Sequence, residues 1–415
     1  MPTLLPLSHH RSHDAVGQNR RRGALTRSRA VTRSWALQRT PAIGVVAALT
    51  VAALAAASTP AGAAITPASA AVTPASAAIT PAGGFDPDDY AFRQVNLVSD
   101  QPGKAALTDK NLVNAWGLSQ GPSTPVWVSD NGTDVTTLYT GGAAGHQPAI
   151  VPLVVRLPGG APTGQVFNPT TGFVLSNRQQ ALFIFAGEDG DISAWNQTLS
   201  PITEAEHVAS IPGGVFKGMA LLQGRSGNRL LVADFAHGRI AAFDGRFHRV
   251  ALPPKAFWDP QLPTGYAPFN VAVLGGRVVV AYTVRNPRTN DDVAGAGHGI
   301  IDVYSAGGRL LRHLVRHGVL NSPWGLAMAP AGFGAFAGDL LVGNFGDGRI
   351  HAFDPRTGHL DGTLRDRHGH AIVIDGLWGL LPGNGTSAGT ADVWFSAGPG
   401  GEAHGLLGVL RPAGE

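Results

Sequence analysis

The chain repeats one sequence pattern six times, and this repetition restricts the fold more than any other feature. Each copy begins with an apolar stretch that opens on a small residue and continues into a strand, a Gly/Asp/Asn turn and a second strand. The anchor residues are Gly117, Gly164, Gly218, Asn270, Gly325 and Gly379, with successive gaps of 47, 54, 52, 55 and 54 residues. Repeats of about 40–50 residues with four short strands each are typical of propeller blades. We therefore predict an all-β, six-bladed β-propeller.

The fifth copy shows the strands most clearly. It predicts strands at residues 324–329, 339–344 and 349–353, and a weaker fourth strand near Thr363. The sixth copy stops after three strands, so its outer strand must come from elsewhere in the chain. We expect residues 93–98 (RQVNLV) to pair with residues 406–410 and close the ring, because closure removes the unpaired edge between the first and last blades.

The N-terminal region differs in composition from the rest. Its first 57 residues contain eight arginines and one acidic residue, Asp14. The Ala-rich segment at residues 42–58 is too short and too weakly apolar to favour a permanent membrane span, and residues 61–63 offer a small-residue cleavage site. We predict a signal peptide at 1–63, a disordered Pro/Ala/Thr-rich spacer at 64–90 and the propeller at 91–412. The alternative is an uncleaved membrane anchor.

Removal of this leader reverses the sign of the net charge. The chain has 31 basic and 28 acidic residues, and without the eight arginines and Asp14 it keeps 23 basic and 27 acidic residues. Such a domain lacks the basic surface that nucleic acids require. The absence of cysteine fits an exported protein with a large core. We expect a secreted monomer with no nucleic-acid partner and no stable membrane span after cleavage.

Two rings of residues should meet at the channel mouth where the inner strands begin. The first ring precedes the anchors: Trp116, Thr163, Lys217, Phe269, Trp324 and Trp378. Its indoles, phenyl ring and ammonium suit a ligand with flat or sugar-like faces, and the alternative is that the aromatic side chains simply fill the channel. The second ring comes from the hairpins: Asp130, Asn131, Glu188, Asp189, Asp191, Asp234, His237, Asn344, Asp347, Glu402 and His404. These groups suit calcium binding or proton transfer, or they stabilise turns.

The fourth copy departs from the pattern twice. Asn270 replaces the anchor glycine, and Asn is the non-glycine residue that best tolerates a left-handed backbone. An insertion at residues 285–299 is either a lid over the channel or a surface loop. Calcium-dependent six-bladed lactonases are similar in placing Asn and acidic residues around the channel mouth. This resemblance implies Asn270, Asn321, Asp375 and Glu402 as ligands of a Ca2+ ion.

Longer segments carry a second resemblance. They are NLVSDQPG (96–103), LVNAWGLS (112–119), WVSDNGT (127–133), SPWGLAMAPAGFGAFAGDLLVGNFGDGRI (322–350), IDGLWGL (374–380) and FSAGPGGEAHGLLG (395–408). Together they resemble an uncharacterised family of exported bacterial proteins related to NHL-repeat six-bladed β-propellers. The resemblance implies fold and export, and it implies no activity.

The sequence thus favours an extracellular binding or scaffold protein over an enzyme. We expect a small molecule, glycan or peptide at the channel mouth, in contact with Trp116, Lys217, Phe269, Asn270, Trp324, Trp378, Glu402 and His404. The alternative is a calcium-dependent hydrolase of the lactonase type, and a third possibility is a metal-free lyase that uses His404 or His237. No HExxH, P-loop or DxDxDG motif is present, so the catalytic residues stay unknown.

Overall fold

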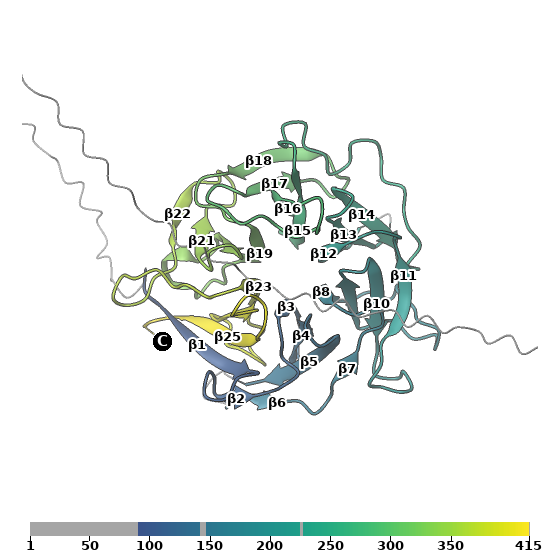
Figure 1. Cartoon of the computed structure of the whole chain (residues 1–415), viewed down its shortest axis with the longest axis horizontal. Helices are drawn as coiled ribbons and strands as arrows, with labels where there is room; N and C mark the ends of the chain where they lie inside the picture. The colour runs from purple at the N-terminus through teal and green to yellow at the C-terminus, as the bar shows by residue number, and fades with distance from the viewer. Residues whose placement is uncertain (1–89, 142–146, 225–226, 415) are drawn as a thin grey trace, which may run out of the picture. The chain divides into compact units, whose positions relative to one another are not determined.

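The computed structural model describes residues 90–141, 147–224 and 227–414. These residues form six sheets around a central axis, together with the 3-10 turn Gly334–Phe336 (Figure 1). The predicted six-bladed propeller is confirmed. The predicted signal peptide and all but the last residue of the spacer lie outside the described residues. None of the helical turns in the described ranges is long and apolar enough to cross a bilayer.

Each blade begins with a strand at the axis and adds its next strands outward. Blade 1 contains β3 (Ala115–Ser119), β4 (Val126–Asp130), β5 (Val135–Thr140), β6 (Ala149–Ile150) and β7 (Val155–Arg156). Blade 2 contains β8 (Pro162–Phe167), β9 (Phe183–Gly187), β10 (Asp191–Trp195) and β11 (Glu206–Ser210). Blade 3 contains β12 (Phe216–Leu222), β13 (Arg229–Asp234) and β14 (Arg239–Asp244).

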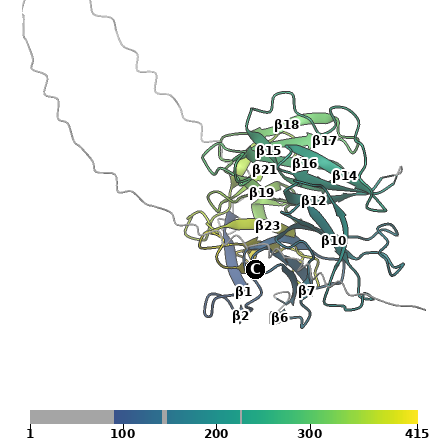
Figure 2. The same ribbon diagram turned by 45° about the vertical axis from the view of Figure 1, so that its right-hand side comes forward.

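The remaining blades follow the same order. Blade 4 contains β15 (Tyr266–Leu274), β16 (Arg277–Val284), β17 (Ile300–Tyr304) and β18 (Leu310–Arg316). Blade 5 contains β19 (Pro323–Met328), β20 (Leu340–Asn344), β21 (Ile350–Phe353) and β22 (Leu360–Thr363). Blade 6 contains β23 (Leu377–Pro382), β24 (Val393–Ala397), β25 (Leu406–Pro412), β1 (Phe92–Ser99) and β2 (Leu107–Thr108). The strands predicted for the fifth copy are confirmed to within a residue at almost every end. Figure 2 shows β18 of blade 4 and β6 of blade 1 at opposite sides of the ring.

The two ends of the propeller domain meet in blade 6. Strand β1 pairs antiparallel with β25, and its register places Arg93 opposite Arg411 and Val98 opposite Leu407. The predicted closure of the ring is therefore confirmed. Strand β2 adds a short parallel pair to the outside of β1.

The anchor glycines are explained by crowding at the axis. A Cβ atom on Gly117 would lie 2.3 Å from the carbonyl oxygen of Thr163, and one on Gly164 would lie 2.5 Å from the amide nitrogen of Met219. Only glycine allows neighbouring inner strands to approach so closely. Neither the glycine anchors nor Asn270 has a positive φ, so the expectation that this position needs a left-handed backbone is wrong.

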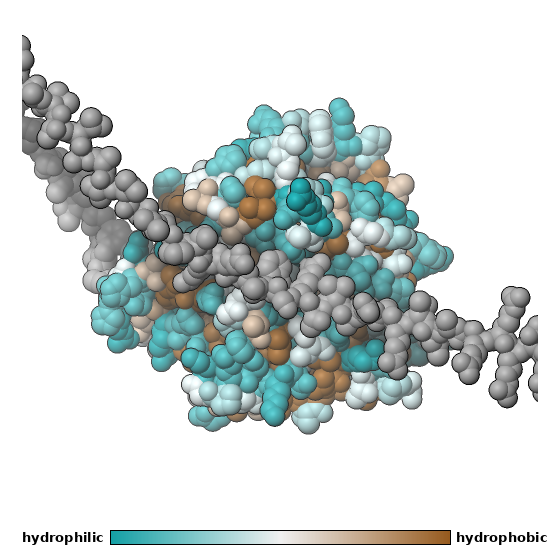
Figure 3. Space-filling view, in the orientation of Figure 1, coloured by the Kyte–Doolittle hydropathy of each residue, from teal (hydrophilic) through white to brown (hydrophobic). Residues whose placement is uncertain are grey.

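Apolar side chains are divided among seven clusters in the described part of the chain. Six clusters each lie between two neighbouring blades, and the seventh lies on the axis. This division explains the runs of consecutive apolar residues, because the two faces of an inner strand pack against different blades. Figure 3 shows hydrophilic residues over most of the uncovered part of one outer face.

Candidate functional site

An aromatic plug closes the central channel at the end where the inner strands begin. We define the plug as the aromatic side chains of the axial cluster: Trp116, Phe235, Phe269, Trp324, Phe345 and Trp378. Trp116 stacks on Trp378 with ring centroids 3.5 Å apart, and Phe345 covers the other side of Trp378 at 3.9 Å. Trp324 meets both indoles edge-on, at 5.9 and 5.8 Å. Edge-on contacts of this kind are favourable for aromatic rings.

The three predicted indoles therefore lie together, but they cover one another. Trp116, Trp324 and Trp378 are 2%, 4% and 1% exposed, and Phe269 is fully buried. The indole nitrogen of Trp378 donates to Asn114 Oδ1 at 3.0 Å, and that of Trp324 donates to the Lys217 carbonyl oxygen at 3.2 Å. In the structure these rings pack against one another. A ligand contact at Trp116, Phe269 and Trp378 therefore stays a prediction.

A network of polar side chains lies against the plug on the predicted mouth side. We call it the mouth network, and it consists of Asn114, Asn131, Glu188, Lys217 and Glu402. Lys217 Nζ lies 2.5 Å from Glu188 Oε1 and 5.0 Å from the centroid of Trp116. Asn114 Nδ2 donates to Glu402 Oε2 at 2.8 Å and to Asn131 Oδ1 at 3.1 Å, and Asn131 Nδ2 donates to Glu188 Oε2 at 3.2 Å.

The mouth network contains two carboxyl groups, Glu188 and Glu402, and one ammonium group, Lys217. Burial by itself lowers the pKa of Lys217, but the charge and the hydrogen bond of Glu188, together with the charges of Asp291 and Asp292, outweigh this effect and the pKa is raised. Burial raises the pKa of Glu402, and the nearby Glu188 carboxylate adds to the shift. The insertion between β16 and β17 contributes Asp291 and Asp292, whose charges also act on Lys217. The sequence did not predict that Asp291 and Asp292 act on Lys217. Both belong to the insertion, and the repeat pattern does not specify where an insertion lies.

The four residues predicted as calcium ligands make separate contacts. Asn270 Nδ2 donates to the Trp324 carbonyl oxygen at 2.6 Å, and Asn321 Oδ1 accepts from the Gly295 amide at 2.7 Å. Asp375 accepts from the Gly400 amide at 2.8 Å, while Glu402 accepts from Asn114 in the mouth network. Of these four, only Glu402 belongs to the mouth network, and calcium binding stays a prediction.

The two histidines considered for proton transfer are held by carboxylates in their own blades. His404 Nδ1 lies 2.8 Å from Asp100 Oδ2, and His237 Nδ1 lies 2.9 Å from both oxygens of Asp234. The Asp100 carboxylate also accepts from the Gly405 amide, which fixes the β24–β25 hairpin. Through these contacts both histidines stabilise turns of their own blades.

A cavity of about 340 Å³ occupies the channel on the other side of the plug. Its wall is formed by residues at and after the anchors of the inner strands, at the end where these strands finish. Apolar side chains such as Leu118, Leu274 and Leu381 line it, and Trp324 contributes the surface of the plug. The sequence predicted a ligand site at the mouth where the inner strands begin, on the other side of the plug. Of the residues predicted to contact the ligand, Asn270 and Trp324 line this axial cavity.

The polar groups of the axial cavity are neutral amides and a hydroxyl: Ser119, Gln120, Gln165, Gln223 and Asn270. Gln165 uses both hydrogens of its amide nitrogen on the carbonyl oxygens of Gly117 and Trp127, at 2.6 and 2.9 Å. Its Oε1 accepts from Ser119 Oγ at 3.1 Å and keeps a further lone pair. No charged side chain is among the described residues that line the cavity. Ser119 and Gln165 were not among the predicted site residues, although both stand within two residues of an anchor.

Comparison with known proteins identifies relatives. No family model matches the chain. It is 32% identical over 295 residues to the uncharacterised protein R648 of Acanthamoeba polyphaga mimivirus, which covers 69% of this chain and 72% of the relative. It is 30% identical over 334 residues to the uncharacterised protein L690 of the same virus, over 76% of this chain and 84% of the relative. These relatives are viral and do not support the bacterial origin that the resemblance implied.

Solved structures support the fold alone. The α-L-arabinanase of Penicillium chrysogenum, solved in complex with arabinobiose, aligns with a TM-score of 0.50 at 12% sequence identity, over 78% of this chain and 98% of the arabinanase chain. That likeness supports the propeller architecture and says nothing about activity. With the two viral relatives covered over more than two thirds of their length, the chain belongs to the family of these uncharacterised mimivirus proteins, and it is a six-bladed β-propeller.

Proposed function

We propose that this propeller is an extracytoplasmic binding protein that holds a small, neutral, hydroxyl-bearing molecule in the axial cavity. The observation that carries the proposal is a cavity of about 340 Å³ whose described lining residues carry no charge. Small-molecule sites typically have volumes of about 300–1000 Å³ and mostly apolar walls with a few polar groups. The proposal moves the predicted ligand site from the strand-start mouth to the opposite side of the aromatic plug.

The polar atoms of the cavity favour a ligand that donates hydrogen bonds. The amide hydrogens of Gln165 are used within the protein, while its oxygen keeps a free lone pair. Among the residues that the structure describes, Asn270 Oδ1 accepts from the Val271 amide alone, so it also has room for a second donor. A charged ligand would lose its hydration without a counter-charge in the wall, which costs far more than these hydrogen bonds return. Neutral sugars and nucleosides have the required hydroxyl groups.

The calcium-dependent hydrolase is the weaker candidate. Its chemistry needs carboxylates around an ion, and the axial cavity contains none among its described lining residues. The carboxylates nearest the axis face the mouth side, where the ammonium of Lys217 already provides a cation for Glu188. A calcium ion at this position would have to displace Lys217.

Export is the second part of the proposal. Its support is the basic start, the Ala-rich apolar segment at residues 42–58 and the small residues at 61–63. Expression of the full chain in a secreting bacterial host, followed by N-terminal sequencing of the extracytoplasmic product, tests this part. We expect a mature N-terminus close to residue 64; retention of the whole chain in the membrane fraction would favour the uncleaved anchor.

The ligand site is tested with a panel of neutral pentoses, hexoses, disaccharides and nucleosides, by saturation-transfer NMR on the full chain. Gln223→Trp places a large ring at the exposed edge of the axial cavity, and Gln197→Trp is the control at an exposed turn of blade 2. We expect at least one panel member to bind, with binding lost in Gln223→Trp and retained in Gln197→Trp. No binding by any panel member, or equal binding by both variants, contradicts the proposal.

A further inference from the structure

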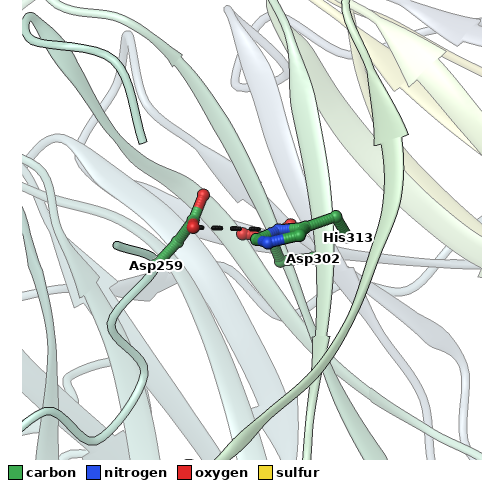
Figure 4. Close-up of side chains that lie close together, drawn as sticks. All are labelled: Asp259, Asp302 and His313. Atoms are coloured by element: carbon green, nitrogen blue, oxygen red, sulfur yellow. Dashed lines mark hydrogen bonds and ion pairs between the residues drawn. The ribbon is translucent and has the colours of Figure 1, made fainter. Parts of the chain in front are cut away.

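Three metal-ligating side chains converge in the outer part of blade 4. Asp302 lies on β17, His313 lies on β18, and Asp259 comes from the connection between β14 and β15 (Figure 4). Each residue offers one ligand atom, and the three atoms all lie within 4.8 Å of one another. In the described part of the chain this is the only group of three or more His, Cys, Asp and Glu residues with such spacing.

The distances match those between ligands of a small divalent ion. His313 Nδ1 lies 3.1 Å from Asp302 Oδ1 and 3.7 Å from Asp259 Oδ1. Zinc binds nitrogen and oxygen ligands at about 2.0–2.2 Å, so neighbouring ligand atoms in a tetrahedral site lie about 3.4 Å apart. Calcium binds oxygen ligands at longer distances and rarely uses imidazole. The geometry and the donor set therefore favour a first-row transition metal over calcium.

Arg316 also lies beside these three side chains. Its Nη2 is 2.5 Å from His313 Nδ1, and because a guanidinium nitrogen can only donate, Nδ1 offers its one lone pair to Arg316. The same Nδ1 faces the acceptor oxygen of Asp302, and two acceptors in contact repel each other. A metal ion at this position would take the lone pair of Nδ1 and lie between Nδ1 and the carboxylates, and Arg316 would keep only its bond to Asp259.

The surroundings of the cluster hold its carboxylates in place. The side chains of Asp259 and Asp302 are completely buried, whereas the His313 side chain is 27% exposed and leaves a route from solvent. Arg316 Nη2 donates to Asp259 Oδ2 at 2.7 Å, and the Tyr304 hydroxyl donates to Asp302 Oδ2 at 3.4 Å. Partners of this kind on the non-ligating oxygens orient the ligands of metal sites.

From this arrangement we infer that Asp259, Asp302 and His313 form a binding site for a divalent transition metal, with zinc as the best match. Three protein ligands leave one position for water on the solvent side, next to His313. The site would hold the 245–265 connection against blade 4, because Asp259 belongs to the connection and the other two ligands belong to the blade. The connection bends sharply just before Asp259, where Lys255 and Phe257 both have positive φ.

The test is a titration of the full chain with Zn2+ by isothermal calorimetry, after removal of bound metal with a chelator. The matched variants are His313→Gln and His370→Gln. His370 is an exposed histidine that faces Asp366, and within residues 90–414 as described it belongs to no group of three metal-ligating side chains. We expect His313→Gln to bind one equivalent of zinc fewer than the original chain, and His370→Gln to bind the same amount. Co2+ should give a visible absorption band that is lost only in His313→Gln.

A second measurement covers the case in which a variant is less stable. Zinc should raise the melting temperature of the original chain and of His370→Gln, and it should not raise that of His313→Gln. Acid should release the metal, since a proton and zinc compete for Nδ1. Equal zinc stoichiometry in the original chain and His313→Gln, or a melting temperature that zinc leaves unchanged, would overturn the inference and leave an ion-pair network only.

Discussion

Asn270 donates a hydrogen bond of 2.6 Å from its side-chain nitrogen to the main-chain carbonyl oxygen of Trp324, across the boundary between blades 4 and 5. The bond joins the one anchor that is not glycine to Trp324, the plug residue that also lines the axial cavity. Asn270 also occupies the space beside Gly218, because a Cβ on Gly218 would lie 1.9 Å from Asn270 Oδ1. One amide side chain thus connects three blades at the axis.

Replacement of Asn270 by glycine restores the anchor of the other copies but removes this bond. We expect Asn270→Gly to lower the free energy of unfolding by about 1–2 kcal/mol, because the buried carbonyl of Trp324 loses its side-chain donor. Urea unfolding followed by tryptophan fluorescence measures the change. An unchanged unfolding midpoint would show that the bond contributes nothing to stability.

Gly218 tests the crowding at the axis. Gly218→Ala should destabilise the propeller by about 1–3 kcal/mol, since the added methyl group collides with Asn270. Gly307→Ala is the control, because Gly307 is exposed and its new Cβ would find only a side-chain oxygen at 3.9 Å. The double variant Gly218→Ala/Asn270→Gly should recover part of the loss. Equal effects of the two Gly→Ala changes would argue against crowding as the reason for the anchor glycines.

Lys217 is the only cation of the mouth network. We expect Lys217→Met to cost about 2–4 kcal/mol at neutral pH, because it removes the ammonium that faces the Glu188 carboxylate at a largely buried position. Lys217→Met/Glu188→Gln should be more stable than Lys217→Met alone. A double-mutant cycle in chemical unfolding gives the coupling energy, and additive effects would mean that the pair is not coupled.

Asp339 gives a prediction for pH. Burial and the charges of Asp361 and Asp354 raise its pKa to about 6 from an ordinary value of 3.8. The folded state therefore binds the proton more tightly than the unfolded state, and stability from this group rises as the pH falls from about 7 to about 4. Asp339→Asn should stabilise the protein at pH 8 by about 1 kcal/mol, after allowance for solvent screening, and should have less effect at pH 4.

Asp366 provides the opposite sign. Although burial acts in the other direction, the amides of His368 and His370 donate to its carboxylate and its pKa is lowered. Asp366→Asn should therefore be less stable than the original chain at neutral pH, and the difference should shrink as the pH falls below the ordinary value of 3.8. Thermal unfolding of both variants between pH 3 and pH 8 measures these trends. Identical pH profiles for the two variants would contradict both assignments.

The sequence predicts the ring well because its information is periodic. Six anchors with similar spacing specify six blades, and the incomplete sixth copy specifies the pairing of β1 with β25. The reason for the anchors was not predictable from residue type alone, since glycine serves both positive φ and close approach. Only the arrangement around Gly218 and Asn270 distinguishes the two.

The sites are predicted less well because they depend on directions and on unrelated segments. The repeat pattern predicts that Trp116, Trp324 and Trp378 lie at the same height along the axis. It does not predict that their rings fill the channel there, or that the cavity lies on the far side of these rings. Asp259 and Asp302 come from segments with no shared motif, 43 residues apart. Their meeting depends on how the connection before β15 packs on blade 4.

The most direct test of the proposed function is a crystal structure of the chain with the tightest-binding member of the neutral panel. The proposed function predicts electron density for the ligand in the axial cavity, in contact with Leu118 and Leu381 and within hydrogen-bonding distance of Gln165 or Asn270. Density beside Lys217 on the mouth side of the aromatic plug, with the axial cavity free of ligand, would contradict it.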